Sequence, residues 1–353
     1  MIINTWALRR LWPSKIKTES VLEEIISRPS PETVRAIQRI DGDIIILGAG
    51  GKIGPSLAIL AKRAIEEAEV EKKVIAVWRF STPEIRQKLS KAGVETIQCD
   101  LLERDEVDKL PKVSNVIYMV GRKFGTKGDE PLTWATNTYI PALIAQKFRN
   151  SRIVVFSTGN VYPLVPISSG GSTESDPPNP IGEYAQSCLG RERIFEYFCR
   201  KFGTKAIFLR LNYAIELRYG VLLDVASKVF RGEPIDLRMG YVNVIWQGDV
   251  NNAAIRSLTI CQNPPKILNI TGPEIISIRW LATRFGEIFG KKPIFQNEEM
   301  DTALLSNASE YHRIFGYPKV TLKQMIEWVA HWILIGGTTW NKPTHYDVRN
   351  GRF

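Results

Sequence analysis

The strongest constraint on the fold is an alternation of short apolar runs with segments of helical periodicity, which begins at residue 43. The runs are rich in β-branched and aromatic residues: DIIIL (43–47), KVIAVW (73–78), VETIQC (94–99), NVIYMV (115–120), RIVVFS (152–157) and KAIFLRL (205–211). Runs of this kind are typical of parallel strands covered on both faces, and right-handed crossovers place the intervening helices. We therefore predict an α/β fold, a Rossmann-type doubly wound parallel sheet with helices on both sides.

The same alternation suggests how the chain is divided. Residues 1–40 are predicted to form a helical arm in which Pro29 and Pro31 separate two amphipathic stretches, and residues 41–215 form the sheet domain. Beyond that point the regular alternation is lost, so residues 216–335 are expected to form a smaller C-terminal lobe, with KILNIT (266–271) returning to the sheet. The tail, 336–353, has turn residues and aromatics without a period, and we expect it to wrap the body or a partner subunit.

Charge and composition limit the partners. The formal net charge is +10, but the 47 Lys and Arg are dispersed, which argues against nucleic acid and leaves an anionic small molecule or a generally basic surface. No run approaches the ~18 apolar residues of a membrane span, and charges interrupt the N-terminus, so we expect a cytoplasmic protein without a membrane contact. The four cysteines lack CxxC spacing and the three histidines lack HxxH spacing, which predicts neither disulfides nor a metal.

A glycine-rich turn, GAGGKIG (48–54), lies between the first apolar run and a helical segment. Strand, turn and helix stand in the order that a dinucleotide site requires: glycines for a tight turn, for close approach of the pyrophosphate and for helix packing, with free N–H groups at the start of the helix. The predicted cofactor-binding residues of this turn are Gly48, Gly50, Gly51, Lys52, Ile53 and Gly54.

The end of the second strand indicates which dinucleotide is bound. NAD sites usually carry an acid there for the ribose hydroxyls, whereas this strand ends in Arg79. Arg79 and Lys52 could pair with a 2′-phosphate, which favours NADP over NAD, although Arg79 could equally cap a solvated strand end. After the third strand, Asp100 and Leu101 are expected to meet the adenine, with an ordinary helix N-cap as the alternative for Asp100.

Taken together, these stretches resemble the extended short-chain dehydrogenase/reductase family, the NAD-dependent epimerase/dehydratases that act mainly on nucleotide sugars. The similarity covers about residues 41–289, and its motifs stand in the family's order: GAGGKIG (48–54), CDLLERDEV (99–107), VIYMVG (116–121), TWATNTYIPALIAQ (133–146), FSTGNVYP (156–163), GDVNNAAIRSL (248–258) and ILNITGPEIISI (267–278). The resemblance implies that Val120, Gly121 and Asn137 contribute to the cofactor site. It also implies a homodimer formed through the helices of Asn137 and Tyr184.

The resemblance also implies the catalytic residues. TESDPPNPIGEYAQSC (173–188) is similar to the family stretch that contains Tyr-x-x-x-Lys, and it places Tyr184 on the tyrosine, with Ser157 and Thr158 on the Ser/Thr position. The lysine position holds Cys188, which cannot supply the charge that lowers a tyrosine's pKa. Cys188 is either a small buried residue in a helix that has lost its lysine or a reactive thiol, for which no activating histidine is evident. Arg122 and Lys123 are candidates for a substitute cation.

Several further residues are expected to contact substrate, with structural roles as the alternative. They are Arg122, Lys123, Asn160, Asn212, Arg218 and Tyr219, and His345 could reach a neighbouring site. Asn160 stands where related dehydratases place an acid. The expected function is an NAD(P)-dependent epimerase, dehydratase or reductase acting on a sugar, a nucleotide sugar or a sugar-derived acid. The alternatives are a lyase or isomerase of the same fold without net hydride transfer, and a non-catalytic NAD(P)-binding protein.

Overall fold

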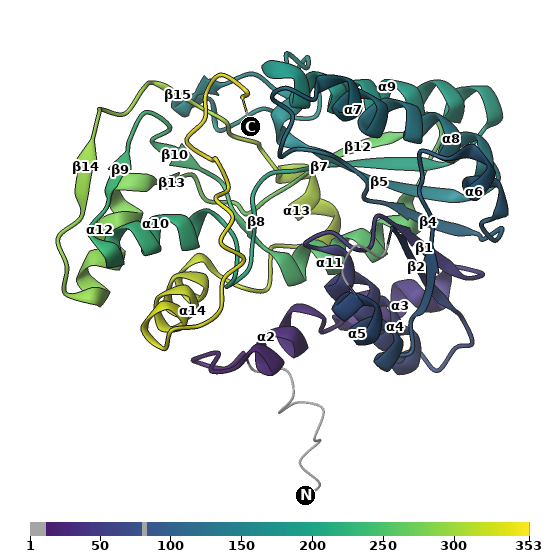
Figure 1. Cartoon of the computed structure of the whole chain (residues 1–353), viewed down its shortest axis with the longest axis horizontal. Coiled ribbons are helices and arrows are strands. Elements are labelled where there is room, and N and C mark those ends of the chain that lie inside the picture. Colours follow the sequence, from purple (N-terminus) through teal and green to yellow (C-terminus); the bar gives the residue numbers. More distant parts are fainter. Residues whose placement is uncertain (1–11, 80–82, 353) are drawn as a thin grey trace, which may run out of the picture.

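The computed structural model describes residues 12–79 and 83–352. Its main element is a seven-stranded sheet in which every strand pairing is parallel (Figure 1). In spatial order the strands are β12 (Lys266–Ile270), β7 (Ala206–Leu211), β5 (Arg152–Thr158), β4 (Asn115–Tyr118), β1 (Ile44–Leu47), β2 (Val74–Trp78) and β3 (Glu95–Gln98). The six apolar runs form six of these strands, and KILNIT supplies the seventh, so the predicted doubly wound fold is confirmed. The strand order reverses between β1 and β4, which is where such sheets bind ligands.

The sheet is buried on both faces except at one edge. In β1, Ile44 and Ile46 belong to one apolar core while Ile45 and Leu47 belong to another, as the period-two alternation of a strand requires. The expectation that all six runs are covered on both sides is wrong for β3, where Glu95 and Gln98 are exposed, because β3 is the edge strand.

Helices cover the two faces as the crossovers predict. One face carries α3 (Pro31–Arg39), α4 (Gly54–Glu67), α11 (Gln247–Ser257) and α13 (Ser309–Phe315). The other carries α6 (Arg104–Lys109), α8 (Ile140–Lys147) and α9 (Gly182–Phe202). The helix α5 (Pro83–Lys91) follows β2, and α7 (Glu130–Trp134) leads into a π-helical turn, Ala135–Tyr139, before α8.

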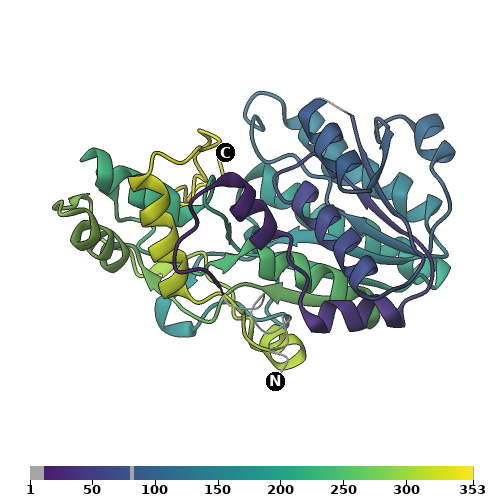
Figure 2. The same ribbon diagram turned by 90° about the horizontal axis from the view of Figure 1, so that it is seen from below.

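The described part of the N-terminal arm, from residue 12, forms two short helices, α2 (Glu19–Ile26) and α3, with Thr18 and Ser30 as their N-caps. Asn252 of α11 binds the start of α3, since its Oδ1 accepts from Ser30 N at 2.7 Å. Figure 2 shows the arm running across the underside of the molecule, where α3 packs on the sheet domain and α2 packs into the apolar core of the C-terminal lobe. The first eleven residues of the predicted arm lie outside the described residues.

A second lobe packs beside the sheet around its own apolar core, with Trp246 and Trp328 at its centre, their ring centroids 5.2 Å apart. Its helices are α10 (Val221–Arg231), α12 (Ile278–Phe289) and α14 (Leu322–Leu334). Pairs of short strands complete it: β6 (Val165–Pro166) with β15 (Thr302–Ala303), β8 (Ala214–Ile215) with β11 (Ile245–Trp246), β9 (Pro234–Asp236) with β14 (Ile294–Gln296), and β10 (Tyr241–Val242) with β13 (Ile276–Ser277). None of the described helices is long and apolar enough to cross a membrane.

The C-terminal tail crosses the molecule between the two lobes, as the yellow trace of Figure 1 shows. Thr344 is its central anchor, because its backbone N and its Oγ1 donate to Asp224 Oδ2 of α10 at 2.8 and 2.6 Å. Further along, Arg349 donates to the carbonyl oxygen of Thr302 at 2.6 Å. The tail therefore wraps the body of its own chain.

Candidate active site

The glycine-rich turn leads from β1 into α4, and its glycines do different things. Gly48 has a positive φ of 87°, which opens the tight turn. A Cβ on Gly51 would meet nothing nearer than the Gly48 carbonyl oxygen at 3.5 Å, whereas one on Gly54 would lie 2.4 Å from the Ala49 oxygen, so Gly54 is needed for helix packing. Gly50 makes room for the Trp78 ring, 2.5 Å from such a Cβ, rather than for a ligand.

The start of α4 offers unpaired backbone donors. Its N-cap, Ile53, provides no side-chain hydrogen bond, Pro55 lies in the first turn, and no acid stands there. A helix N-terminus of this kind favours an anion through its N–H groups and its dipole.

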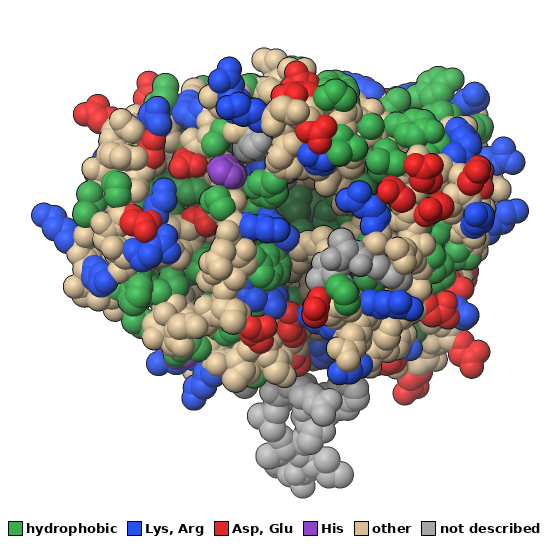
Figure 3. Space-filling model, in the orientation of Figure 1, with side chains coloured by type: hydrophobic (Ala, Val, Ile, Leu, Met, Phe, Trp, Pro, Cys, Tyr) green, Lys and Arg blue, Asp and Glu red, His purple; other side chains and the backbone are tan. Residues whose placement is uncertain are grey.

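A cavity of about 390 Å³ begins at this turn and ends at the predicted catalytic residues. Figure 3 shows a hollow at the centre of this face, floored by hydrophobic side chains, with Lys and Arg beside it. The lining comes from both lobes and from the tail: Gly48, Gly51, Lys52, Ile53, Gly54, Met119, Gly121, Lys123, Phe124, Phe156, Ser157, Thr158, Asn160, Tyr184, Arg191, Leu211, Asn212, Tyr213, Ala214, Tyr219, Val221, Gln247 and Thr344. The described residues of this lining include three cationic side chains and no Asp or Glu.

Tyr184 and Thr158 meet in this cavity. A side-chain hydrogen bond from Thr158 favours the ionised phenol, but burial and the neighbouring Cys188 outweigh it and raise the pKa of Tyr184 above its usual value. Thr158 Oγ1 also accepts from Asn160 Nδ2 at 2.9 Å. Ser157 is committed elsewhere, because its Oγ donates to Glu192 Oε1 at 2.5 Å.

Glu192 and Arg210 form a buried ion pair behind Ser157. The guanidinium of Arg210 donates to both carboxylate oxygens, at 3.0 and 2.7 Å, and both side chains are 2 % exposed. This pair links α9 to β7, next to the strand that carries Ser157 and Thr158.

Cys188 is fully buried among Val161, Tyr162 and Tyr184, and burial raises the pKa of its thiol. The positive charge of Arg191, also on α9, opposes this increase in the Cys188 pKa, and Arg191 was not identified as a site residue from the sequence. The missed signal was spacing, since Arg191 follows Tyr184 by seven residues, two helical turns, and so falls on the same helix face.

Two lysines enter the cavity. Lys52 Nζ lies 3.2 Å from the ring centroid of Tyr219 and 4.4 Å from that of Phe124. Burial, with Lys123 and Lys342 nearby, lowers the pKa of Lys52 to about 7. Lys123 Nζ donates to the Thr344 carbonyl oxygen at 3.1 Å and lies 6.0 Å from the Tyr184 ring centroid, and burial lowers its pKa to about 8.

Lys52 and Arg79 were expected to contact one 2′-phosphate together, but they line different cavities. Arg79 lines a separate cavity at the edge of the sheet with Asp100, whereas Lys52 lines the cavity that contains Tyr184.

Asp100 Oδ1 accepts from the Leu102 backbone N at 3.1 Å within a turn. The N-cap of α6 is Glu103, so the alternative that Asp100 caps a helix is wrong. Leu101 packs its side chain into the core.

Asn137 is fully buried and holds the loop after β4. Its Oδ1 accepts from Arg122 N at 3.1 Å and its Nδ2 donates to Ser187 Oγ at 2.9 Å, so the amide connects the loop after β4 to α9. Val120 packs against the core on one side of the sheet. The Arg122 side chain pairs with Asp129 at 2.7 Å within its own loop, whereas Lys123 enters the cavity.

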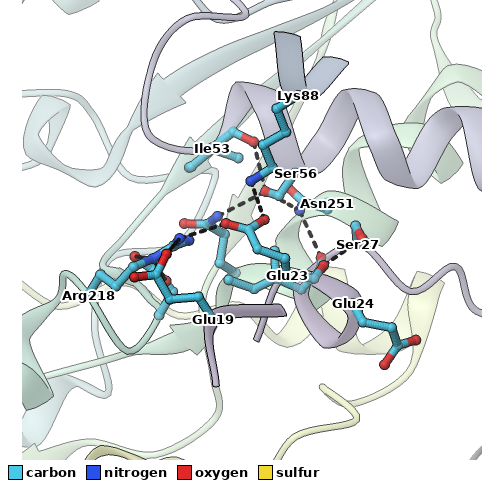
Figure 4. Close-up of polar contacts among 12 residues, drawn as sticks. Glu19, Glu23, Glu24, Ser27, Ile53, Ser56, Lys88, Arg218 and Asn251 are labelled. Atoms are coloured by element: carbon cyan, nitrogen blue, oxygen red, sulfur yellow. Dashed lines mark hydrogen bonds and ion pairs between the residues drawn. The ribbon is translucent and has the colours of Figure 1, made fainter. Parts of the chain in front are cut away.

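Arg218 belongs to an ion-pair cluster on the arm instead of the cavity (Figure 4). Its Nη1 lies 2.6 Å from Glu23 Oε1, and Lys88 reaches the other oxygen of Glu23 at 2.5 Å. Burial raises the pKa of Glu216, which also pairs with Arg218, to about 7. Of the other predicted substrate contacts, Asn160, Asn212 and Tyr219 do line the cavity.

His345 packs its ring against Phe124, with centroids 5.9 Å apart. It lies beside a second cavity, of about 330 Å³, between the tail and α10. Among the residues that the structure describes, no group of three His, Cys, Asp or Glu side chains could hold a metal ion.

Comparison with solved structures shows that this architecture is shared. UDP-glucose 4-epimerase of Thermus thermophilus, in complex with NAD, superposes with a TM-score of 0.66 at 20% identity, over 82% of this chain and 97% of that one. UDP-glucose 4-epimerase of Thermotoga maritima gives 0.67 at 17% identity, over 83% and 98%. UDP-glucuronic acid 4-epimerase of Bacillus cereus, with UDP-glucuronic acid and NAD, gives 0.67 at 16% identity, over 83% and 99%.

No curated protein sequence matches the chain. A family model does match, over residues 44–215, a span that contains the glycine-rich turn, the predicted catalytic residues and six of the seven strands of the sheet. Residues 44–215 therefore match the NAD dependent epimerase/dehydratase family.

Proposed function

We propose that this protein is an NAD(P)-dependent enzyme of the epimerase, dehydratase or reductase type that acts on an anionic, sugar-type substrate. The observation that carries this proposal is the single cavity that joins the glycine-rich turn to Tyr184 and Thr158. Its lining includes both the glycine-rich turn, where we propose that the pyrophosphate binds, and Tyr184, the proposed acid/base, and this proximity supports hydride exchange with a hydroxyl-bearing carbon.

The residues present fit a dinucleotide. Gly51 leaves the approach to the turn open, and the uncapped N-terminus of α4 presents its N–H groups to a pyrophosphate. Gly121 and Met119, at the end of β4, line the path from the turn toward Tyr184. The nicotinamide of such a cofactor, when bound, supplies a hydride acceptor or donor.

The chain's own groups handle the proton. As tyrosinate, Tyr184 takes the proton of the substrate hydroxyl when the carbon is oxidised, and the resulting Tyr184 hydroxyl gives a proton back to the substrate oxygen when the carbon is reduced. Thr158 fixes the orientation of the phenol through their hydrogen bond. Asn160 in turn orients Thr158. The apolar walls, which include Phe156 and Leu211, keep water from the reacting atoms.

The charge of the cavity supports an anionic substrate. Lys52 lies over the Tyr219 ring, in the part of the cavity that faces the second lobe. An ammonium whose pKa burial has lowered gains a partner, and regains its proton, when a carboxylate or phosphate binds beside it. The structural neighbours named above include one complex with UDP-glucuronic acid, which carries both groups.

The preference for NADP over NAD now depends on Arg79 alone. Its cavity at the edge of the sheet also contains Lys109, which adds to the positive charge, and Glu106, which opposes it. Binding titrations with NAD and NADP test the preference in the wild type and in Arg79→Ala, and a selective loss of NADP affinity in the variant is expected. Equal affinities in the wild type would remove Arg79 from this role.

We also propose a homodimer through the helices of Asn137 and Tyr184. Three aromatic side chains on this surface are partly exposed: Trp134 at 36%, Tyr139 at 45% and Tyr197 at 57%. Burying such rings is a common source of dimer stability. Sedimentation analysis of the wild type and of Tyr197→Glu tests this, with a dimer that the charge weakens as the expected result and a monomeric wild type as the contrary one.

The catalytic proposal is tested by incubating the protein with either dinucleotide and a panel of sugars, sugar acids and nucleotide sugars. Conversion of an anionic sugar is expected, with a loss of about 10² to 10⁴ in turnover for Tyr184→Phe and little change in dinucleotide affinity. Conversion without any dinucleotide would favour a lyase or isomerase. Full turnover in Tyr184→Phe would overturn the assignment of Tyr184.

A further inference from the structure

We propose that Arg191 supplies the positive charge that helps Tyr184 to ionise, and that Cys188 is small so that this guanidinium fits. The inference deepens the proposed function, since it concerns the acid/base group of the same site. A buried phenol needs a nearby cation if its tyrosinate is to be populated at all, because burial disfavours the charged form.

The position of Arg191 on α9 is the first step. Tyr184, Cys188 and Arg191 are spaced by four and three residues, so all three share one face of the helix. Tyr184 and Arg191 both line the cavity, and Cys188 lies buried between them along the helix. The arginine side chain is long and starts about one helical turn beyond Cys188, so it can place its guanidinium near the Tyr184 phenol.

Its anchoring is the second step. Arg191 is 5% exposed, its Nη1 donates to the Phe156 carbonyl oxygen at 2.9 Å, and its Nη2 donates to Asn137 Oδ1 at 2.6 Å. A Cβ on Gly121 would lie 2.6 Å from that same Nη2, so the loop after β4 closes directly over the guanidinium. The charge is therefore fixed in place next to the strand that carries Thr158.

Its electrostatic surroundings are the third step. Arg191 opposes the upward pKa shifts of Tyr118 and Tyr184 and of the Cys188 thiol, and these groups in turn raise the pKa of Arg191. Its Nε is buried without a hydrogen-bond partner among the described residues. Such a donor is costly unless a group bound in the cavity, or a water, accepts from it.

Lys123 is the rival. It lies in the loop after β4, its Nζ is 6.0 Å from the Tyr184 ring centroid, and it donates a hydrogen bond to Thr344 of the tail. With a pKa of about 8, however, Lys123 loses its charge as the pH rises through the range in which a tyrosine begins to ionise, whereas Arg191 keeps its charge. We therefore assign to Arg191 the positive charge near Tyr184 that persists as the pH rises.

The test measures the ionisation of Tyr184 itself. A difluorotyrosine placed at position 184 has a more acidic phenol and a fluorine NMR signal, so its pKa can be followed in the full-length protein without substrate or cofactor. Arg191→Met should raise that pKa by at least one unit, a tenfold loss of tyrosinate. Arg191→Lys should retain most of the effect, and Arg193→Met, which removes an exposed arginine of the same helix, should change nothing.

Moving the charge supplies the decisive variant. Cys188→Lys in the Arg191→Met protein should bring the pKa back down, because the ammonium then lies on the same helix face one turn earlier. In the wild type the same Cys188→Lys change should lower the melting temperature, because two cations then compete for one buried space. Melting curves of every variant identify any that fail to fold, in which case Arg191→Lys and the double variant carry the comparison.

The possible results distinguish a failure of the assignment to Arg191 from a failure of the proposed function. An unchanged Tyr184 pKa in Arg191→Met, or a larger increase in Lys123→Met than in Arg191→Met, would overturn the assignment to Arg191. Because the titration uses neither substrate nor dinucleotide, it stays informative even if no sugar is converted. Conversely, an unchanged Tyr184 pKa in Arg191→Met together with normal sugar turnover would overturn this inference and leave the proposed function intact.

Discussion

Gly51→Val separates ligand binding from folding within the glycine-rich turn. A side chain at this position meets only the Gly48 carbonyl oxygen, at the ordinary contact distance of 3.5 Å, and Gly51 does not have a left-handed φ. The substitution should therefore leave the melting temperature within a few degrees of the wild type. The valine methyl groups would instead project into the cavity, where the pyrophosphate is expected.

The expected loss of affinity follows from the hydrogen bonds that are displaced. If the valine pushes the pyrophosphate off two N–H donors of the turn, each charge-assisted bond costs about 1.5–3 kcal/mol. Together these losses weaken dinucleotide binding by about 10² to 10⁴. Calorimetric titration of NAD and NADP into wild type and variant measures the change.

Gly54→Val is the matched control three residues further along. Its Cβ would lie 2.4 Å from the Ala49 carbonyl oxygen, a backbone atom that cannot move aside, so this variant should lose folding stability by several kcal/mol. The reasoning fails if Gly51→Val binds dinucleotide as tightly as the wild type. It also fails if the two valine variants melt alike.

Two further predictions concern charge. Lys52→Met should weaken the binding of a sugar acid but not of the corresponding neutral sugar. In the wild type the sugar acid should bind less tightly as the pH rises through about 7, because Lys52 of the free protein loses its proton there. Binding titrations at a series of pH values should show no such dependence in the variant. Glu192→Leu should destabilise the fold by about 3–5 kcal/mol in chemical denaturation, because it leaves the Arg210 guanidinium buried without its partner. An unchanged midpoint would mean that the pair contributes nothing to stability.

The sheet could be predicted from sequence because continuous apolar runs and glycine-rich turns are local signals. The order of the motifs likewise led to the cavity, which contains Tyr184, Thr158 and Lys123. Local signals do not report how an edge strand is exposed, and for that reason β3 was expected to be covered on both faces.

Residues whose roles depend on distant partners could not be placed in this way. Arg218 was expected to contact substrate, but Glu23, 195 positions earlier in the chain, holds it on the arm. Lys52 was expected to contact a 2′-phosphate together with Arg79, but its ammonium lies over the ring of Tyr219, from the loop after β8, in a different cavity from Arg79. Arg191 could not be identified from the Tyr-x-x-x-Lys pattern, because that pattern ends at position 188, one turn before Arg191 on the same helix.

The most direct test of the central claim mixes dinucleotide-loaded protein with a large excess of an anionic sugar that it converts, and follows the absorbance of the reduced nicotinamide in a stopped-flow instrument. The account predicts that reduced cofactor forms in the wild type, whether transiently or as product, and that its formation slows by about 10² to 10⁴ in Tyr184→Phe. Conversion of the sugar with no reduced cofactor at any time, or equal rates in wild type and Tyr184→Phe, would contradict a cavity in which Tyr184 and the nicotinamide act on one substrate carbon.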